Sequence, residues 1–340
     1  MFGHRNTSGF WSGSFQLGRR WSRPVAVAAA VAVIALGAPG SVATSATASP
    51  DRDCDETTQV NSRVTPGATH GSDPNSVTPA RAAAMDRALQ KSVSRLKKQG
   101  TLNRSGSLSA TAPKVIRIRT HVHVITRTNG TGNVPTSRIN AQIKVLNDAY
   151  AGKSSTSTVA TPFQFDLASV DVTKNNNWYD WNPDTDNDAA KKALHRGGYT
   201  HLNLYIASLS DGLLGYATFP TANDLNDDGV VILNNSLPGG SAAPFNLGDT
   251  ATHEVGHWLG LFHTFQGGCT APGDHVQDTP YQADGDNIFY CDASDNTCTQ
   301  PGKDPVHNYM SYGDDPCLNR FTAGQVQRMS QSWFANRSGK

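Results

Sequence analysis

The stretch HEVGHWLGLFH, which begins at His253, constrains this chain more than any other segment. In a helix, His253 and His257 project from the same face about one turn apart, because they are four residues apart. Two imidazoles in that arrangement can bind one metal ion. Glu254 follows the first histidine, where it can reach a metal-bound water without binding the metal itself. The segment therefore predicts the site of a metal-dependent hydrolase.

The full pattern HExxHxxGxxH makes this motif more specific than a short HExxH match. Gly260 lets the backbone leave the helix with a positive φ, and His263 then returns as a third ligand. Three histidines leave one position open for water, which is the catalytic form of a zinc site. An ordinary buried helix would explain the apolar residues of the stretch. It would not explain three histidines and one glutamate at these spacings.

The N-terminus has the pattern of a secretory signal of bacterial style. Several arginines precede an uninterrupted apolar stretch, residues 25–36, and small-residue cleavage sites follow it. The apolar run is too short for a membrane anchor, so we expect residues 1–48 to be removed from a secreted, extracellular protein. The pair Arg19-Arg20 raises twin-arginine export, and the sequence leaves the export route open.

Charge divides the chain near residue 113. Residues 114–340 carry 16 Lys and Arg against 22 Asp and Glu, a net charge of −6. This acidic balance argues against nucleic acid and anionic membranes as partners. We expect a monomer that acts on proteins or peptides and does not bind membranes after processing. Glu254 is the only glutamate in this region.

Residues 49–112 have the composition of a propeptide, rich in Ser, Thr, Pro and Ala. One helix is predicted to start at Thr78-Pro79, and its apolar face carries Met85, Leu89, Val93 and Leu96. The segment RSGSLSATAP, residues 104–113, is predicted to be an exposed linker of the kind that proteases cut. The expected domains are a signal peptide (1–48), a propeptide (49–112) and a catalytic domain (113–340) with an upper lobe (113–264) and a lower lobe (265–340).

From residue 114 the pattern is that of a compact α/β unit. Alternation in residues 114–126 predicts a strand with one buried face, and places His121 and His123 on the opposite, wetter face as surface histidines rather than ligands. A helix is predicted after Thr136 or Ser137, either of which can cap it. The other predicted elements are strands at 163–172 and 201–209, a helix around 189–194, and short strands in GLLGYATFP and GVVILNN.

From Gly267 onward, Gly, Asp, Pro and Cys dominate and predict a loop-rich lobe closed by one helix. Thr322 and Gln325 are predicted to form a capping box at its start. Val326, Met329 and Trp333 line one of its faces. Most aspartate clusters of the chain suit turns. DLNDDG (224–229) also fits the first half of a calcium loop, but Asn235 replaces the glutamate of its twelfth position, which favours the turn.

Beyond the histidine motif, NYMSY (308–312) follows in the order seen in metzincin metallopeptidases, which these residues resemble, with Met310 as the methionine of the Met-turn. HTFQGGC (263–269) and GDHVQDTP (273–280) are similar to the pappalysin family, especially its secreted microbial branch. The resemblance covers the zinc helix and most of the C-terminal lobe closely, and the strands from 114 to 240 loosely. It implies a twisted mixed sheet and an active-site helix in an upper lobe, and a loop-rich, disulfide-bonded lower lobe that ends in a helix.

The resemblance also implies a role for each motif residue. Glu254 would deprotonate the water that attacks a peptide carbonyl and pass the proton to the leaving amine. Met310 would form a hydrophobic base under the metal. Tyr312 would either hydrogen-bond the tetrahedral oxyanion or approach the zinc when substrate is absent. Core packing is the plainer explanation of Met310 and Tyr312, but their place after the Asn308-Tyr309 turn favours the functional one. The ligands of one catalytic Zn²⁺ would be His253, His257 and His263.

Four cysteines lie in the predicted catalytic domain: Cys269, Cys291, Cys298 and Cys317. An even number in an exported, loop-rich lobe predicts two disulfides, and sequence alone allows three pairings. The family resemblance favours Cys269 with Cys298 and Cys291 with Cys317. Cys54 is left over in the expected propeptide. Its thiolate is a candidate for the open zinc position and so for a latency switch, although RDCDET lacks the glycine that often follows such a cysteine.

Two loops near the zinc motif carry further candidate residues. GDHVQDTP resembles a family loop that can bind Ca²⁺ near the substrate cleft; Asp274, Asp278 and Thr279 offer the oxygens, and a turn explains them nearly as well. Asp314 and Asp315, just past the Met-turn, are candidates for the pocket of the residue after the scissile bond. Such a pocket would prefer Arg or Lys, in keeping with the acidic net charge.

The sequence thus favours a secreted, zinc-dependent endopeptidase made as a latent preproenzyme. One competing class is a catalytically inactive zinc module used for binding or adhesion. Glu254 and the open ligand position argue against it, because a structural site needs neither. The other competitor is an unrelated secreted zinc hydrolase that acts on something other than peptides. The combination of Gly260, His263 and Met310 argues against that class.

Overall fold

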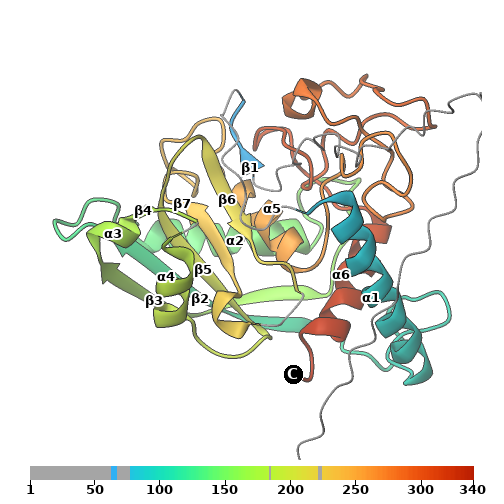
Figure 1. Ribbon diagram of the computed structural model, residues 1–340, viewed down its shortest axis with the longest axis horizontal. Coiled ribbons are helices and arrows are strands. Elements are labelled where there is room, and N and C mark those ends of the chain that lie inside the picture. Colours follow the sequence, from blue (N-terminus) through green and yellow to red (C-terminus); the bar gives the residue numbers. More distant parts are fainter. Residues whose placement is uncertain (1–62, 67–76, 184, 221–223) are drawn as a thin grey trace, which may run out of the picture. The chain divides into compact units, whose positions relative to one another are not determined.

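The structure is a computed structural model that describes residues 63–66, 77–183, 185–220 and 224–340. This part contains a seven-stranded sheet in the order β1-β6-β7-β5-β2-β3, with β4 (Asp180–Trp181) paired to β5 off this path (Figure 1). β6 (Leu213–Ala217) runs antiparallel to β7, and β1 (Arg63–Val64) runs antiparallel to β6. The remaining strands run parallel to one another: β2 (Ile116–Thr126), β3 (Phe163–Lys174), β5 (His201–Leu209) and β7 (Val230–Leu233).

The helices of the described residues follow the order that the sequence predicts, with the short α3 as an unpredicted addition. They are α1 (Pro79–Lys98), α2 (Thr136–Tyr150), α3 (Asn176–Tyr179), α4 (Asn187–Leu194), α5 (Asp249–Trp258) and α6 (Ala323–Asn336), with 3₁₀ turns η1 (Leu225–Asp227) and η2 (Asp286–Phe289). Among the described residues, none of the helices combines the length and apolar character that a membrane crossing needs. The fold is the mixed α/β arrangement with a twisted mixed sheet that the sequence predicts.

Both faces of the sheet are covered, which explains its long apolar strands. In β2, exposed and buried residues alternate up to Arg119, and every residue from Thr120 to Thr126 is buried. One face of the sheet packs against α2, α5 and α6, and the other packs against Trp181 and α4. A parallel sheet with helices on both faces needs apolar residues at consecutive positions. α5, which carries the histidine motif, is therefore held rigidly against the first of these faces.

His121 and His123 are buried, so the prediction that they lie on a wet face of the strand is wrong. His123 Nδ1 pairs with Asp171 at 3.0 Å, and its Nε2 lies 3.0 Å from Asn203 Oδ1. Alternation shows which residues share a face of a strand, but it does not show whether a crossover segment covers that face. Among the described residues, neither histidine belongs to a close group of three metal-binding side chains.

The burial of His121 makes stability depend on pH. Its ring lies between Ser169 Oγ at 2.7 Å and His201 Nδ1 at 3.0 Å. Burial, followed by the nearby charges of His201, His123, Arg196 and Arg119, lowers the pKa of His121 from 6.5 to about 4. The unfolded chain therefore binds more protons between these two values, so the free energy of unfolding falls as the pH falls from 6.5 toward 4.

We expect the His121→Gln variant to lose less stability than the wild-type protein over this pH range. One pKa unit corresponds to about 1.4 kcal/mol, so the difference is on the order of 2 kcal/mol after discounting for solvent screening. Urea unfolding at about pH 7, 5.5 and 4, a range that spans the two pKa values, measures this difference in stability. Parallel pH profiles for the two proteins would contradict the assignment.

Of two predicted helix starts, the one at Thr78-Pro79 is confirmed and the one at Thr136 or Ser137 is not. The helix predicted at Thr78-Pro79 is α1, and the Thr78 side chain accepts a hydrogen bond from Arg81 N at 3.2 Å. α2, however, begins at Thr136 after Pro135, and no side chain caps it, so the predicted cap at Thr136 or Ser137 is wrong. Pro135 fixes its own φ near the value that precedes a helix and moves the start of the helix one residue earlier.

The segment 104–113 is predicted to be an exposed linker, but part of it packs against α1 and α6. Gly106 is buried, and Leu108 packs with the apolar faces of α1 and α6. Gln327 and Gln331 of α6 donate hydrogen bonds to the carbonyls of Ser105 and Gly106 at 2.9 and 3.0 Å. α1 and α6 lie side by side in Figure 1. The polar composition concealed this packing because the contacts use backbone carbonyls.

The region after Gly267 contains few regular elements, as predicted. Two disulfides join its loops, Cys269–Cys298 and Cys291–Cys317, which is the pairing that the family resemblance implies. Thr322 and Gln325 form the predicted capping box of α6. Two covalent links therefore tie the loops of this lobe together, and a capped helix closes it.

Two aspartates of the acidic segment DLNDDG form internal ion pairs. Asp228 pairs with Arg337 at 2.9 Å and accepts a hydrogen bond from Trp258 Nε1 at 3.0 Å. Asp227 pairs with Lys191 at 3.3 Å. These carboxylates stabilise the loop and anchor the end of α5, which agrees with the turn interpretation.

Candidate metal centre and substrate pocket

Three histidines from α5 and the turn after it meet at one point. Nε2 of His253 and Nε2 of His257 lie 3.1 Å apart on successive turns of α5. α5 ends at Trp258, and Gly260 then adopts a φ of +98°, where a Cβ atom would also lie 2.5 Å from Ser332 Oγ. Glycine is therefore needed for the sharp return. It brings His263 Nε2 to within 3.1 Å of His253 Nε2 and 3.0 Å of His257 Nε2.

Backbone carbonyls orient two of these rings. Tyr309 O lies 2.6 Å from His253 Nδ1, and Leu261 O lies 2.8 Å from His257 Nδ1. Since a carbonyl only accepts, Nδ1 carries the proton and Nε2 keeps its lone pair. Burial lowers the pKa of all three histidines, that of His257 to about 4, so the rings are neutral at pH 7. A set of three neutral imidazoles fits a transition metal ion.

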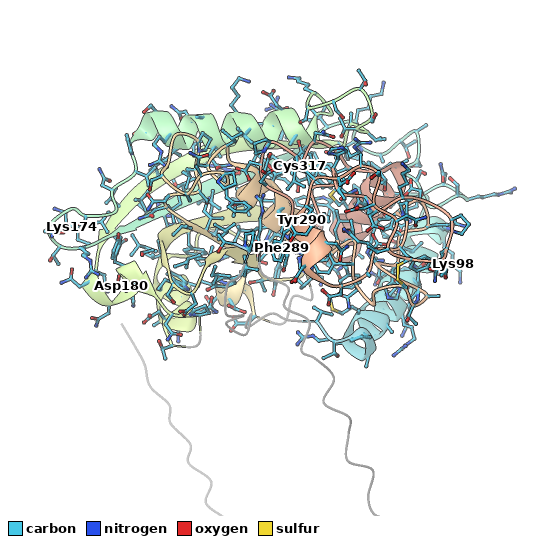
Figure 2. All side chains as sticks on the ribbon, turned by 90° about the horizontal axis from the view of Figure 1, so that it is seen from above. Lys98, Lys174, Asp180, Phe289, Tyr290 and Cys317 are labelled. Carbon is cyan, nitrogen blue, oxygen red and sulfur yellow. A yellow bond between two sulfur atoms is a disulfide. The ribbon has the colours of Figure 1, made fainter. Side chains whose placement is uncertain are left out.

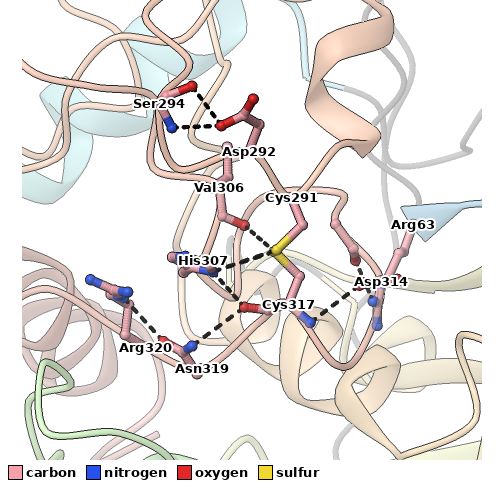
Figure 3. Close-up of a disulfide and its surroundings, with 11 residues drawn as sticks. Arg63, Cys291, Asp292, Ser294, Val306, His307, Asp314, Cys317, Asn319 and Arg320 are labelled. Carbon is pink, nitrogen blue, oxygen red and sulfur yellow. Dashed lines mark hydrogen bonds between the residues drawn. A yellow bond between two sulfur atoms is a disulfide. The ribbon is translucent and has the colours of Figure 1, made fainter.

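One other group of His and Cys side chains comes as close together within the described residues. It consists of Cys291, His307 and Cys317. The two sulfur atoms are joined in a disulfide, as Figure 3 shows, so neither is a thiolate. The three-histidine group is therefore the candidate metal centre of the described residues.

Met310 and Tyr312 lie against the three-histidine group. Met310 is fully buried beside α5, where a Cβ atom at Gly256 would lie 2.4 Å from Met310 Sδ. Only glycine lets the sulfur approach the helix this closely. The ring centroids of Tyr312 and His263 lie 4.8 Å apart. The structure thus brings together the residues that the sequence places in the Met-turn and the zinc motif.

The far side of Tyr312 is covered by η2. The ring of Phe289 lies 5.6 Å from that of Tyr312, centroid to centroid. Its neighbour Tyr290 is 60% exposed, and both residues are labelled near the middle of Figure 2. This edge of the metal centre therefore carries aromatic surface that is open to solvent.

Asp315 lies at the start of α5. Its Oδ2 accepts hydrogen bonds from Leu247 N at 2.7 Å and Gly248 N at 3.0 Å. A negative carboxylate is favoured here because helix N-termini carry partial positive charge and free N–H groups. Gly248 has a φ of +103°, which lets the chain turn into the helix over this carboxylate. Asp315 therefore fixes the start of the metal-binding helix.

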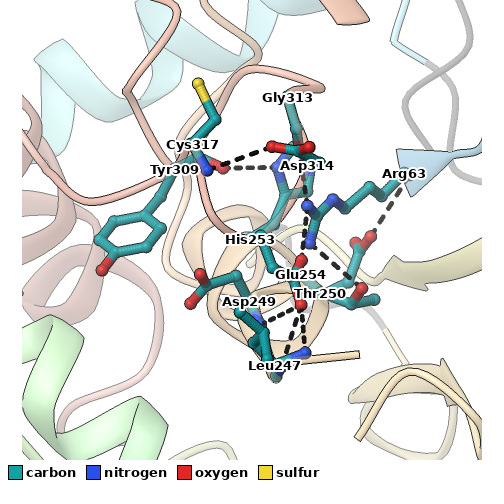
Figure 4. A network of polar contacts seen from close by, with 12 residues as sticks. Arg63, Leu247, Asp249, Thr250, His253, Glu254, Tyr309, Gly313, Asp314 and Cys317 are labelled. Atoms are coloured by element: carbon teal, nitrogen blue, oxygen red, sulfur yellow. Dashed lines mark hydrogen bonds and ion pairs between the residues drawn. The ribbon is translucent and has the colours of Figure 1, made fainter. Parts of the chain in front are cut away.

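The other oxygen of Asp315 faces a buried guanidinium, and the space that this guanidinium fills is called the Asp315 pocket below. Asp315 Oδ1 pairs with Arg63 Nη2 at 2.8 Å, and both side chains are fully buried. Arg63 also donates to Thr250 Oγ1 at 3.2 Å and to Gly313 O at 2.8 Å (Figure 4). Burial, followed by the charge of Asp315, raises the pKa of neighbouring Asp249 to about 7. The Arg63 guanidinium thus contacts one carboxylate, one hydroxyl oxygen and one backbone oxygen, all of which suit a cationic side chain.

Asp314 does not share this pocket contact. Its carboxylate accepts the Cys317 N–H at 3.2 Å and so stabilises the turn that leads into the disulfide (Figure 3). Asp314 is also partly exposed, whereas Asp315 is buried. Of the two predicted pocket residues, the structure therefore brings one to the guanidinium.

The three predicted calcium residues differ in their exposure and in their contacts. Asp274 and Thr279 are buried, and burial raises the pKa of Asp274 to about 7. Asp278 is exposed and accepts hydrogen bonds from Thr322 Oγ1 at 2.7 Å and Gly324 N at 2.9 Å, so it caps α6. Cys54, the candidate latency cysteine, lies outside the described residues.

Comparison with known proteins assigns the family. The chain is 44% identical over 243 residues to an extracellular metalloprotease of Sordaria macrospora. The matched region covers 70% of this chain and 80% of that protein. It is 40% identical over 250 residues to extracellular metalloprotease 1 of Coccidioides posadasii, covering 72% and 86%. A family model for peptidase family M43, described as pregnancy-associated plasma protein-A, matches residues 184–333. This chain belongs to the pappalysin family of metallopeptidases.

Two solved structures are similar to the fold of this pappalysin. Mature mirolysin of Tannerella forsythia in complex with a cleaved peptide matches with a TM-score of 0.56 and 29% identity over 65% of this chain and 97% of that one. A promirolysin mutant from the same organism matches with a TM-score of 0.60 and 28% identity over 76% and 92%. The protein is thus a secreted metalloprotease with a metzincin fold, and its substrates are proteins or peptides.

The sequence carries no direct indication that Arg63 lies beside the candidate site of this pappalysin. Arg63 stands in the expected propeptide, 191 residues before Glu254, to which its backbone N–H donates at 3.4 Å. One signal was available: Arg63 is the only Lys, Arg, Asp or Glu between Glu56 and Asp73. A lone cation in a long uncharged stretch suggests a specific partner. Only the fold shows that this partner is Asp315.

Proposed function

We propose that this pappalysin is a zinc-dependent endopeptidase made as a latent precursor. The observation that carries the proposal is the convergence of three neutral imidazole nitrogens, 3.0 to 3.1 Å apart, on the helix that also carries Glu254. Catalytic zinc takes three protein ligands and leaves one position open. His253, His257 and His263 would hold the ion, which when bound polarises a water molecule and the substrate carbonyl.

Glu254 is the proposed general base. It is buried beside His253, and its Oε1 lies 3.4 Å from the nitrogen of an extended segment in the site. A carboxylate there can take a proton from the attacking water and deliver it to a leaving amine nitrogen. A purely structural zinc site needs no such group. Its presence argues against an inactive binding or adhesion module.

Met310 and Tyr312 have supporting roles in the proposal. Met310, packed into the space left by Gly256, would form the apolar floor of the centre. Tyr312 lies against His263 and would donate its hydroxyl to the oxyanion of the tetrahedral intermediate. Both roles agree with the position of these residues beside the histidines.

Asp315 is the proposed specificity residue. The Arg63 guanidinium that fills its pocket is buried, paired and hydrogen-bonded. A substrate Arg or Lys after the scissile bond would satisfy the same carboxylate. A neutral side chain would leave the carboxylate buried without its partner, which costs free energy. We therefore propose cleavage before Arg, with Lys as the second choice because it lacks the bidentate fork.

Latency and calcium complete the proposal. The match to promirolysin supports an inactive precursor, in which the Cys54 thiolate would occupy the open zinc position. Because Asp278 caps α6, Asp274 and Thr279 are the candidates that remain for a calcium ion. A cation would offset the burial of the Asp274 carboxylate.

Metal removal tests the proposed function. Chelation should abolish hydrolysis of a quenched peptide that contains Arg, and about one equivalent of zinc per chain should restore it. His257→Ala should lose stoichiometric zinc in elemental analysis. His201→Gln, a histidine of β5 outside the centre, should keep its zinc and serves as the control. Full activity in protein that contains no zinc would exclude the proposal.

A further inference from the structure

Two arginines far along the chain hold the turn between the second and third histidines of the centre. α5 ends at Trp258, and the last carbonyls of a helix have no partner within it. Trp258 O accepts hydrogen bonds from Arg337, which directly follows α6. Gly260 O accepts one from Arg328 of α6. The turn that leads to His263 is therefore held by side chains from outside α5.

Arg328 contacts this turn on both sides of its centre. Its Nε donates to Gly260 O at 2.9 Å, and its guanidinium carbon lies 4.8 Å from the ring centroid of Phe262. Its Nη1 donates to Asp86 of α1 at 2.6 Å, and both of these side chains are largely buried. Phe262 directly precedes His263 in the chain. Arg328 is thus fixed by α1 and in turn fixes the segment next to the third histidine.

Arg337 holds the end of α5 in a similar way. Its Nε and Nη2 donate to Trp258 O at 3.1 and 2.9 Å, and its guanidinium carbon lies 3.5 Å from the ring centroid of Trp258. Both oxygens of Asp228 accept hydrogen bonds from the same guanidinium, at 2.9 and 3.0 Å. A planar guanidinium makes these contacts together, which a lysine ammonium cannot do. The last carbonyl of α5 is therefore fixed by a paired, buried arginine.

The third histidine depends on this turn more than the other two depend on it. His253 and His257 lie on one helix, so the spacing of their rings is set by α5. His263 reaches them only through the turn at Gly260, whose φ of +98° lies in a region that favours glycine. Glycine loses more conformational freedom than other residues when it is fixed. Contacts that fix this turn should therefore strengthen metal binding.

We infer that Arg328 and Arg337 are positioning residues of the metal centre, which hold the turn after α5 and so fix His263 as the third ligand. The inference rests on the proposed function, because it takes zinc as the ion that the histidines bind. Both arginines act through backbone carbonyls. Loss of groups that orient metal ligands commonly lowers metal affinity by about 10-fold to 100-fold. Zinc affinity should therefore depend on α6 and, through Asp86, on α1.

Zinc titration in competition with a chromogenic chelator tests the inference. The reference is the metal-free full chain with Glu254→Gln, which prevents self-digestion during the titration. Arg328→Met keeps the stem of the side chain but removes its donors, and should weaken zinc binding by roughly tenfold or more.

Arg328→Gln is the matched rescue variant. Its amide nitrogen takes the place of the arginine Nε and can donate to Gly260 O, whereas the pair with Asp86 is lost as in Arg328→Met. We therefore expect Arg328→Gln to keep most of the zinc affinity. Equal losses in the two variants would mean that the ion pair matters and the contact with Gly260 does not, which would overturn the inference.

A double-variant cycle shows whether the effect passes through His263. In a His263→Ala chain, Arg328→Met should not weaken zinc binding further, because the ligand that Arg328 positions is gone. Equal weakening with and without His263 would contradict the inference. Arg337→Met and Arg337→Gln repeat the comparison at Trp258 O, and they decide the question if Arg328→Met fails to fold.

Arg138→Met is the control for the loss of a carbonyl-binding arginine. Arg138 donates to the carbonyls of Asn234, Leu237 and Pro238 at 3.0 to 3.1 Å, in the turn after β7. Its loss should lower the free energy of unfolding and leave zinc affinity unchanged. A thermal melt without metal shows whether each variant is folded during the titration. Reference affinity in folded Arg328→Met overturns the inference and leaves the proposed function intact, whereas a reference chain that binds no zinc overturns both.

Discussion

Replacement of Glu254 with glutamine should lower kcat for peptide hydrolysis by roughly 10³-fold or more and leave the fold intact. Proton transfer by a positioned base contributes about 10²- to 10⁴-fold to such reactions, and glutamine cannot accept the proton. No second glutamate exists in residues 114–340 to replace it. The amide has nearly the same size, so the packing of α5 and the zinc content should not change. Steady-state kinetics and elemental analysis on the same preparation measure both effects.

Asp166→Asn is the control for this substitution. Asp166 is a partly exposed carboxylate of β3 that pairs with Arg117 at 3.0 Å on the surface. Its loss should leave kcat unchanged, because exposed pairs contribute little. If Glu254→Gln retained activity within about tenfold of the wild type with its zinc bound, Glu254 would not be the base.

Replacement of Asp315 with asparagine should remove the preference for Arg after the scissile bond. kcat/KM for an Arg peptide should fall by roughly 30-fold to 10³-fold, the usual cost of removing one partner of a buried charge pair. kcat/KM for a Leu peptide should stay the same or rise, because the buried charge that disfavours Leu is gone. Kinetics on matched peptides that differ only at this position give the selectivity ratio.

Two further variants separate selectivity from folding. Asparagine keeps an oxygen that can accept the N–H groups of Leu247 and Gly248, whereas Asp315→Ala also uncaps α5 and should destabilise the protein by about 1 kcal/mol or more. Asp314→Asn should preserve the Arg preference, because its carboxylate serves the turn at Cys317. If Asp314→Asn lost the preference and Asp315→Asn kept it, the pocket would be assigned to the wrong residue.

Local patterns predicted the elements that depend on neighbouring residues. The motif from His253 to His263 specifies its own geometry, because helical spacing and one glycine bring the rings together. The capping box at Thr322 is local in the same sense. These features could be derived without knowledge of the fold because their partners lie within a few residues.

Predictions that needed knowledge of distant partners were less successful. His121 and His123 looked solvated because the alternation of β2 does not reveal the covered second face of the sheet. The segment 104–113 looked like a linker because its contacts with Gln327 and Gln331 run through backbone carbonyls, which leave no trace in composition. In each case the missing information was which distant element packs there.

The sequence by itself predicted the three-histidine motif with its candidate base, the even set of cysteines and a secretory leader, since each depends on the type and spacing of nearby residues. Only the tertiary structure decided that Arg63 pairs with Asp315 and that α1 packs against α6. The physical reason is that a buried ion pair and a helix interface join residues hundreds of positions apart. Chain topology, rather than local propensity, brings such residues together.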